Sequence, residues 1–108
     1  MVAKQLRYTT PWNDSVKELE RQFGLWHVAR QDWSIEAAAT QWRAYNQALG
    51  PTQRAVSLRF PFGGRELLLS CNAQETPAGN LRVLCMAVES MRLNEVRGLY
   101  DVMREAYL

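Results

Sequence analysis

The chain has 108 residues, 47% of them hydrophobic and 22% charged, a composition typical of one folded domain rather than of a disordered chain. Its net charge is only +2, which excludes a strong general attraction to nucleic acid. No apolar run reaches the roughly 20 residues that cross a bilayer, and the first residues lack the apolar centre of a signal peptide. We therefore expect one soluble, cytoplasmic domain over residues 1–108.

The first helix is expected to begin at Asn13-Asp14-Ser15. Ser15 and Glu18 have the spacing of a capping box, in which each side chain bonds the free backbone N–H of the other residue. Gly24 suits the position just past the helix end. The apolar face of this helix contains Val16, Leu19 and Phe23.

Residues 35–49 have apolar side chains at helical spacing and are predicted to form a second helix. The stripe consists of Ile35, Ala38, Trp42, Tyr45 and Leu49. This helix would begin after Asp32 or Ser34 and end at Gly50-Pro51, because proline cannot continue a helix. Residues 25–28, before it, fit either a short strand or an extended connector.

Residues 55–71 give the clearest strand signal. Val56, Leu58 and Phe60 alternate with Ser57 and Arg59 before Gly63-Gly64, and Leu67, Leu69 and Cys71 alternate with Leu68 and Ser70 after it. Glycine reaches the positive φ angles that a two-residue hairpin turn requires, and this turn fixes the register. The expected facing pairs are Phe62 with Arg65, Phe60 with Leu67, Leu58 with Leu69, and Val56 with Cys71. The missing N–H of Pro61 points outward in this register, so a third strand beside the first is not expected to reach Pro61.

A third helix is predicted from Thr76-Pro77 or Asn80 onward, and it should be central because apolar residues cover much of its circumference. Its core stripe consists of Leu81, Leu84, Cys85, Val88 and Met91, widened by Val83, Met86 and Leu93. Gly98 interrupts it, and a short fourth helix is expected from Leu99 to Tyr107. The expected fold class is α+β: an antiparallel β-hairpin, with a third short strand as an option, packed against three to four helices.

No pattern in the chain indicates catalysis. His27 is the only histidine, and neither Cys71 nor Cys85 has the flanking residues of a known class of cysteine enzyme. Both cysteines are expected to be reduced and buried. No group of residues has the spacing of metal ligands. We therefore expect no enzyme, no metal and no cofactor, and we expect His27 to be a structural side chain.

Arginine supplies 11 of the 13 cationic residues. Its planar guanidinium group binds carboxylates and phosphates, although a genome rich in G and C also raises arginine usage without any functional cause. The candidate contacts to nucleic acid or to a partner are Arg54, Arg59, Arg65, Arg82, Arg92 and Arg97. The four tryptophans would supply either stacking rings or pieces of the core.

Two apolar surfaces favour a protein partner, because monomers avoid exposed apolar patches. One is the outer face of the hairpin, where Leu68 points away from the core. The other is the carboxyl end of the chain. The candidate interface residues there are Leu99, Met103, Tyr107 and Leu108.

From Trp12 onward, and most strongly after Val56, the chain resembles the amino-terminal accessory region of bacterial and phage J-domain-containing proteins. The hairpin VSLRFPFGGRELLLSC and the end of the chain carry this resemblance. The matching residues are Asn80, Leu81 and Arg82, then Arg92, Leu93, Glu95, Arg97 and Gly98, then Ala106, Tyr107 and Leu108. A J domain stimulates its chaperone through a His-Pro-Asp loop, and His27-Val28-Ala29 is not one, so the resemblance implies no such activity.

The leading hypothesis is a small non-enzymatic interaction module, phage- or plasmid-borne, that acts through a protein partner or by self-association. The alternative is a nucleic-acid-binding accessory protein that uses the arginines of the hairpin.

Overall fold

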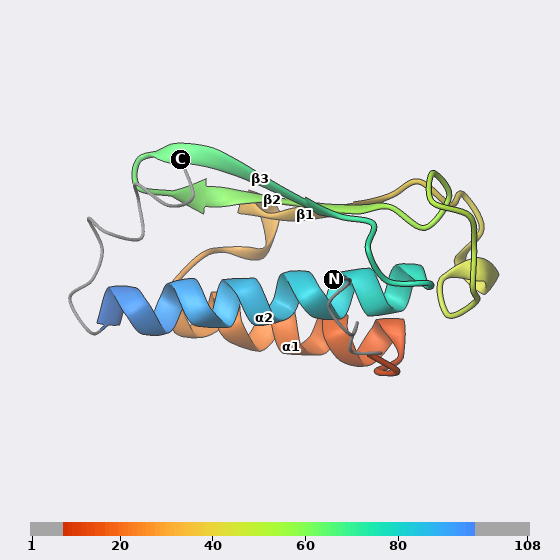
Figure 1. Ribbon diagram of the computed structural model, residues 1–108. Helices are drawn as coiled ribbons and strands as arrows, with labels where there is room; N and C mark the ends of the chain where they lie inside the picture. The colour runs from red at the N-terminus through yellow and green to blue at the C-terminus, as the bar shows by residue number, and fades with distance from the viewer. Residues whose placement is uncertain (1–7, 97–108) are drawn as a thin grey trace, which may run out of the picture.

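The computed structural model describes residues 8–96 and arranges them in two layers, a sheet above a pair of helices (Figure 1). The helices are α1 (Trp12–Leu25) and α2 (Pro77–Val96), and the strands are β1 (Ser34–Ala37), β2 (Val56–Phe62) and β3 (Arg65–Cys71). Two 3₁₀ turns, η1 (Arg30–Asp32) and η2 (Trp42–Ala44), lie in the connections. The sheet is antiparallel in the order β1-β2-β3, so β2 is its central strand.

The hairpin has the register that its turn predicts. The facing pairs include Phe62 with Arg65, Phe60 with Leu67, Leu58 with Leu69, and Val56 with Cys71. Gly63 and Gly64 both have positive φ, which the tight turn requires. β1 pairs with β2 from Ser34 opposite Arg59 to Ala37 opposite Val56. β1 is thus the additional strand beside β2, and its pairing stops before Pro61, as predicted.

The inner face of the sheet packs against α2, and this contact forms the centre of the core. The predicted stripe of α2 is buried throughout: Leu81, Leu84, Cys85, Val88 and Met91. Leu58 of β2 is fully buried, and Leu69 of β3 is partly buried against the same cluster. From α1, Phe23 places its ring centroid 4.9 Å from Trp33 and 5.2 Å from Phe60.

The predicted second helix is wrong, and with it the expectation of three to four helices. The structure describes two α-helices and a three-stranded sheet. Ile35 lies in β1 opposite Leu58 of β2, and Trp42 is 73% exposed in η2. Strand pairing satisfies backbone groups of β2 that a helix would leave open, and this tertiary contact outweighs the local helical spacing. The expected fourth helix and Leu99, Met103, Tyr107 and Leu108 lie outside the described residues.

The start of α1 also differs from the prediction. Pro11 is the N-cap, the helix begins at Trp12, and no side chain of the N-cap makes a capping hydrogen bond. Ser15 lies inside the helix and is buried, so it does not form the expected capping box with Glu18. The helix includes Gly24 and ends at Leu25.

The irregular loop between β1 and β2 holds the starts of both helices, which lie side by side and run in the same direction (Figure 1). The Oδ1 atom of Asn46 accepts a hydrogen bond of 2.9 Å from the backbone N of Trp12. The carbonyl of Tyr45 accepts one of 2.8 Å from the backbone N of Ala78. Helix starts leave backbone N–H groups without partners, and two neighbouring loop residues satisfy one such group in each helix.

Asn80, fully buried near the start of α2, ties three segments together. Its Oδ1 atom accepts hydrogen bonds from the backbone N of Gln74 at 2.7 Å and from Sγ of Cys71 at 3.2 Å. Its Nδ2 atom donates to the carbonyls of Arg54 at 2.8 Å and Gln74 at 3.2 Å. The side chain thus joins the end of β3 and the approach to β2 to the same turn of α2.

Replacement Asn80→Ala is expected to lower the free energy of unfolding by about 3 kcal/mol, because it strands a backbone N–H and two carbonyls in the interior. Urea unfolding followed by circular dichroism measures this change. Asn72→Ala is the control, because the Asn72 side chain is exposed. Equal unfolding midpoints for the two variants would contradict the structural role of Asn80.

Replacement Ser15→Ala is expected to stabilise the protein by about 1 kcal/mol. The Oγ atom of Ser15 is buried without a hydrogen-bond partner, and alanine both removes this polar atom and favours a helix more than serine does. The midpoint of thermal unfolding should rise by several degrees. A lower midpoint would show that the hydroxyl has a partner in solution.

Candidate functional site

The residues with potential chemistry do not come together. His27 is exposed, and its backbone has a φ of 60° in the turn after α1. Cys71 donates to Asn80, while Cys85 donates to the carbonyl of Ser15 at 3.1 Å. Burial raises the pKa of the Cys85 thiol to about 12, so this thiol stays protonated and unreactive. No group of three His, Cys, Asp or Glu side chains in residues 8–96 could hold a metal ion.

The arginines that the sequence singles out are divided among separate places. Arg54 lies beside the sheet, and its Nε donates a hydrogen bond of 2.7 Å to the carbonyl of Asn72. Arg59 lies on the sheet, and its Nη1 donates one of 2.9 Å to Glu66 Oε1. Arg65 is exposed at the hairpin turn. Arg97 lies outside the described residues. The structure therefore does not bring the hairpin arginines and those of α2 into one basic surface.

Arg82 and Arg92 belong to α2, where they face the polar residues of α1. Arg92 Nε donates to Gln22 Oε1 at 2.7 Å, and Gln22 Nε2 donates to Glu18 Oε1 at 2.9 Å. Hydrogen bonds from Arg21 and Gln22 lower the pKa of Glu18 from 4.5 to about 2, and the charge of Arg82 adds to this effect. Arg82 and Arg92 thus take part in the polar contact between the two helices.

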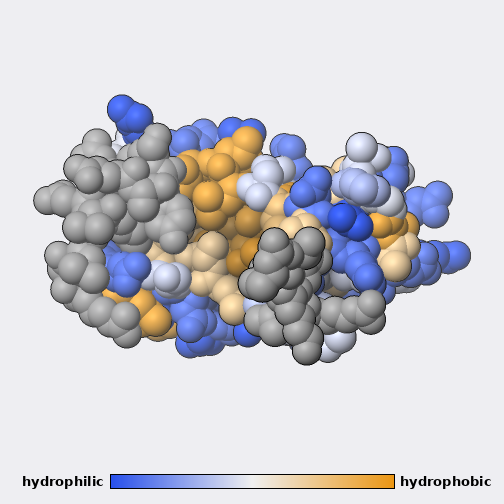
Figure 2. All heavy atoms as spheres, viewed as in Figure 1, coloured by the Kyte–Doolittle hydropathy of each residue, from blue (hydrophilic) through white to orange (hydrophobic). Residues whose placement is uncertain are grey.

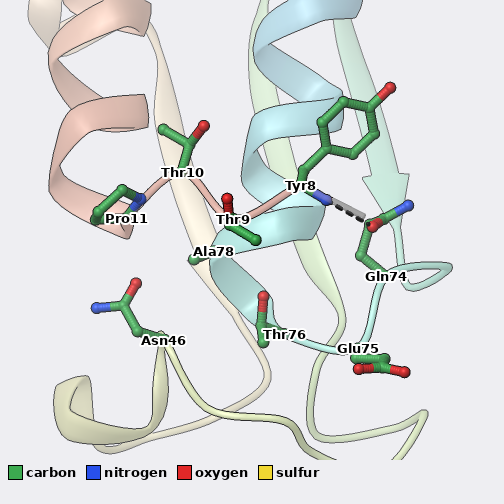
Figure 3. Close-up of a pocket in the computed structure, with 9 residues that line it drawn as sticks. All are labelled: Tyr8, Thr9, Thr10, Pro11, Asn46, Gln74, Glu75, Thr76 and Ala78. Atoms are coloured by element: carbon green, nitrogen blue, oxygen red, sulfur yellow. Dashed lines mark hydrogen bonds between the residues drawn. The ribbon is translucent and has the colours of Figure 1, made fainter. Parts of the chain in front are cut away.

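A pocket of about 450 Å³ lies where the two helices begin (Figure 3). Its lining comes from the segment before α1, from the loop between η2 and β2, and from the segment that leads from β3 into the start of α2. The lining residues are Tyr8, Thr9, Thr10, Pro11, Asn46, Gln74, Glu75, Thr76 and Ala78.

The polar side chains of this pocket mainly support the fold. Thr76 Oγ1 accepts a hydrogen bond of 2.9 Å from the backbone N of Gly79, and Asn46 holds the first residue of α1. Figure 3 shows Gln74 turned toward the backbone N of Tyr8, with 3.4 Å between Oε1 and N. These contacts join the two helix starts, so the pocket is a structural junction.

The outer edge of β3 has a different character, because its backbone groups have no partner within residues 8–96. Ala38 donates to the carbonyl of Ala55, so the odd-numbered residues of β2 face β1 and the even-numbered ones face β3. In β3, Leu67 and Leu69 accordingly bond to β2. The backbone N–H and C=O groups that point away from the sheet belong to Glu66, Leu68 and Ser70.

Apolar side chains lie beside this edge. Leu68 is 50% exposed on the outer face of the sheet, as its alternation predicts. We define a β3–α2 seam below the edge by four partly buried residues, Leu69 and Cys71 of β3 and Val83 and Ala87 of α2. Figure 2 shows apolar atoms gathered at the centre of this face, over β3 and α2.

The position of Val83 and Ala87 follows from the contacts of α2 with α1. Cys85 and Arg92 face α1, since they bond to Ser15 and Gln22. At 100° per residue, Val83 and Ala87 lie on the opposite flank of α2. α2 packs under β2 and β3, so this flank lies beneath the open edge of β3.

The two edges of the sheet are protected to different degrees. Natural sheets block unwanted pairing with short edge strands, charged side chains (lysine above all), proline or bulges. In β3 the charged residues are Arg65 and Glu66, both at the hairpin end of the strand. β1 is only four residues long, whereas β3 has seven residues in unbroken register, with neither proline nor lysine. Alternation in the sequence predicts the exposure of Leu68 but not the open edge itself. The local signal is the lack of proline, lysine and charge in residues 67–71, which does not by itself identify the edge strand.

Comparisons with protein-family models, curated proteins and solved structures find no match for this chain. The resemblance to the accessory region of J-domain-containing proteins therefore stays a prediction. No helix within the described part of the chain is long and apolar enough to cross a membrane.

The depressed pKa of Glu18 predicts a pH dependence of stability. Because the pKa is lowered in the folded state, ionised Glu18 stabilises the fold above about pH 4.5, and this contribution disappears as the pH falls toward 2. Glu18→Gln should therefore unfold at lower urea concentration than the parent at pH 7, with the gap closing near pH 2. Glu20→Gln, on the exposed side of α1, is the control. A gap of constant size across this range would contradict the pKa shift.

Proposed function

We propose that this chain is a non-enzymatic protein-interaction module whose docking site is the open edge of β3. An extended segment of a protein partner pairs with this edge and adds a strand to the sheet. The observation that carries the proposal is the row of outward backbone groups at Glu66, Leu68 and Ser70. Such a row provides the hydrogen bonds on which strand-addition complexes depend.

The side chains around the edge support the same function. An added strand places alternate side chains above and below the sheet, and those below it would cover the β3–α2 seam. Those above it would lie beside Leu68, which is half exposed in the free protein. Both contacts remove apolar surface from water, and this burial supplies affinity in addition to the backbone hydrogen bonds.

The arginines give less support to a nucleic-acid function. Arg59 is paired with Glu66, and Arg82 and Arg92 lie beside Glu18 and Gln22 of α1. Phosphate binding draws on cationic groups gathered along one surface. The engagement of these side chains elsewhere favours the protein-binding alternative.

Amide hydrogen exchange measured by NMR tests the docking site. The probe is a synthetic peptide with the sequence of residues 65–71, in which serine replaces the cysteine. Slowed exchange is expected at the amides of Glu66, Leu68 and Ser70, either with the peptide or in concentrated protein alone. The amides of Leu67 and Leu69 should be protected throughout, because they bond to β2. Unprotected exchange at the three edge amides under both conditions would refute the proposed function.

Two lysine variants sharpen the result. Leu68→Lys places a charge on the edge and should abolish peptide binding. Leu25→Lys changes a leucine of matched exposure, 51% against 50%, at the end of α1 and should leave binding unchanged. Equal effects of the two substitutions would show that binding does not depend on the edge of β3.

A further inference from the structure

We propose that the strand bound at this edge is β3 of a second copy of the same chain, paired antiparallel about a twofold axis at Leu68. The inference rests on the proposed function and specifies its partner. It joins two three-stranded sheets into one continuous sheet of six strands. The sequence of β3, the position of α2 and the composition of its flank each support a second copy.

The register follows from the strand itself. Centring on Leu68 pairs all seven residues of β3: Leu68 faces its own copy, Glu66 faces Ser70, Leu67 faces Leu69, and Arg65 faces Cys71. The outward groups of Glu66, Leu68 and Ser70 then form reciprocal hydrogen bonds, as an antiparallel pair requires. Centring on Glu66 instead would oppose two carboxylates and leave half of the strand unpaired, which is unfavourable.

The spacing of the helices in such a dimer is favourable. Neighbouring strands lie about 4.8 Å apart. Because α2 contacts both β2 and β3, we place its axis midway beneath these two strands, which is about half a strand spacing inside the edge. Two copies joined at this edge therefore place their α2 axes about 10 Å apart, which is the distance of packed helices. The twofold axis makes these two helices antiparallel.

The twofold axis at Leu68 passes between the two copies of α2, beside a small residue of each helix. Cys71 Sγ bonds to Asn80, so these two positions lie one above the other. Leu68 is three residues from Cys71 along β3, or about 10 Å. The same length along α2, at 1.5 Å per residue, leads from Asn80 to about Ala87. Ala87 is partly exposed and lies on the flank below the open edge, where a small side chain permits close approach of two helices.

The flank of α2 carries no charge where the two copies would meet. Val83, Ala87, Ser90 and Asn94 follow one another at spacings of four, three and four residues along this flank. A helix that only faced water would be expected to carry charged residues on such a stripe. An uncharged, small-residue stripe suits an identical stripe better than it suits water.

Disulfide cross-linking tests the register. In a Cys71→Ser background, Leu68→Cys places two thiols across the axis with Cα atoms about 5.5 Å apart, a separation that a disulfide spans. Mild oxidation should convert most of this variant to a covalent dimer. Leu25→Cys, at a site of matched exposure on α1, should stay monomeric under the same oxidation. The buried Cys85 can be kept, because its thiol is unreactive.

Light scattering of the full chain tests the assembly. The expected mass is about 25 kDa, twice the 12.4 kDa of one chain. Ala87→Glu sets two carboxylates against each other at the axis and should raise the dimer dissociation constant about 100-fold. Met86→Glu, one residue away on an exposed side of α2, should leave the constant within a few-fold of the parent.

A mass of 12.4 kDa at millimolar protein concentration would overturn the inference. So would a dimer that forms no disulfide through Leu68→Cys and keeps its dissociation constant in Ala87→Glu. Either result leaves the proposed function standing if the β3 peptide still protects the amides of Glu66, Leu68 and Ser70. Loss of that protection as well would refute both proposals.

Discussion

The fold depends on one contact, the packing of the inner face of the hairpin against α2. β2 alternates strictly between its two faces, so a register error of one residue would expose Leu58 and Phe60 and bury Ser57 and Arg59. The tight turn at Gly63-Gly64 prevents that error. Because this contact fixes where β3 ends and how α2 lies beneath it, it also fixes the open edge and the seam below it.

The sequence predicts this part of the structure well, because its signals are local and redundant. The hairpin has a period of two, a turn that admits one register, and a proline that marks where its neighbour stops. The apolar stripe of α2 from Leu81 to Met91 is predictable because it requires only a helix that packs this face against one apolar surface. Residues 35–49 have no such redundancy. Their helical spacing is genuine, but Ile35 gains more from pairing beside Leu58 than from a helix, and periodicity alone cannot weigh that contact.

The candidate site was only partly predictable for a related reason. The exposure of Leu68 follows from alternation within one strand. The openness of the β3 edge depends on the order of strands in the sheet, and no local pattern encodes that order. Had the segment after Ser34 paired with β3 instead of β2, the same residues would make a buried strand. The function we propose therefore follows from topology more than from any motif.

The loop between β1 and β2 has a consequence for how this chain can vary. Tyr45 and Asn46 hold the starts of α2 and α1, and the backbone N of Leu49 donates to the carbonyl of Glu75 at 2.9 Å. A segment without regular structure is thus shared by two helices that are far apart in the chain. Insertions near Trp42 would be tolerated, because this residue is exposed to solvent. An insertion or deletion of one residue between Tyr45 and Leu49 would detach both helix starts at once. Selection should therefore preserve the length of this segment more strictly than its irregular backbone suggests.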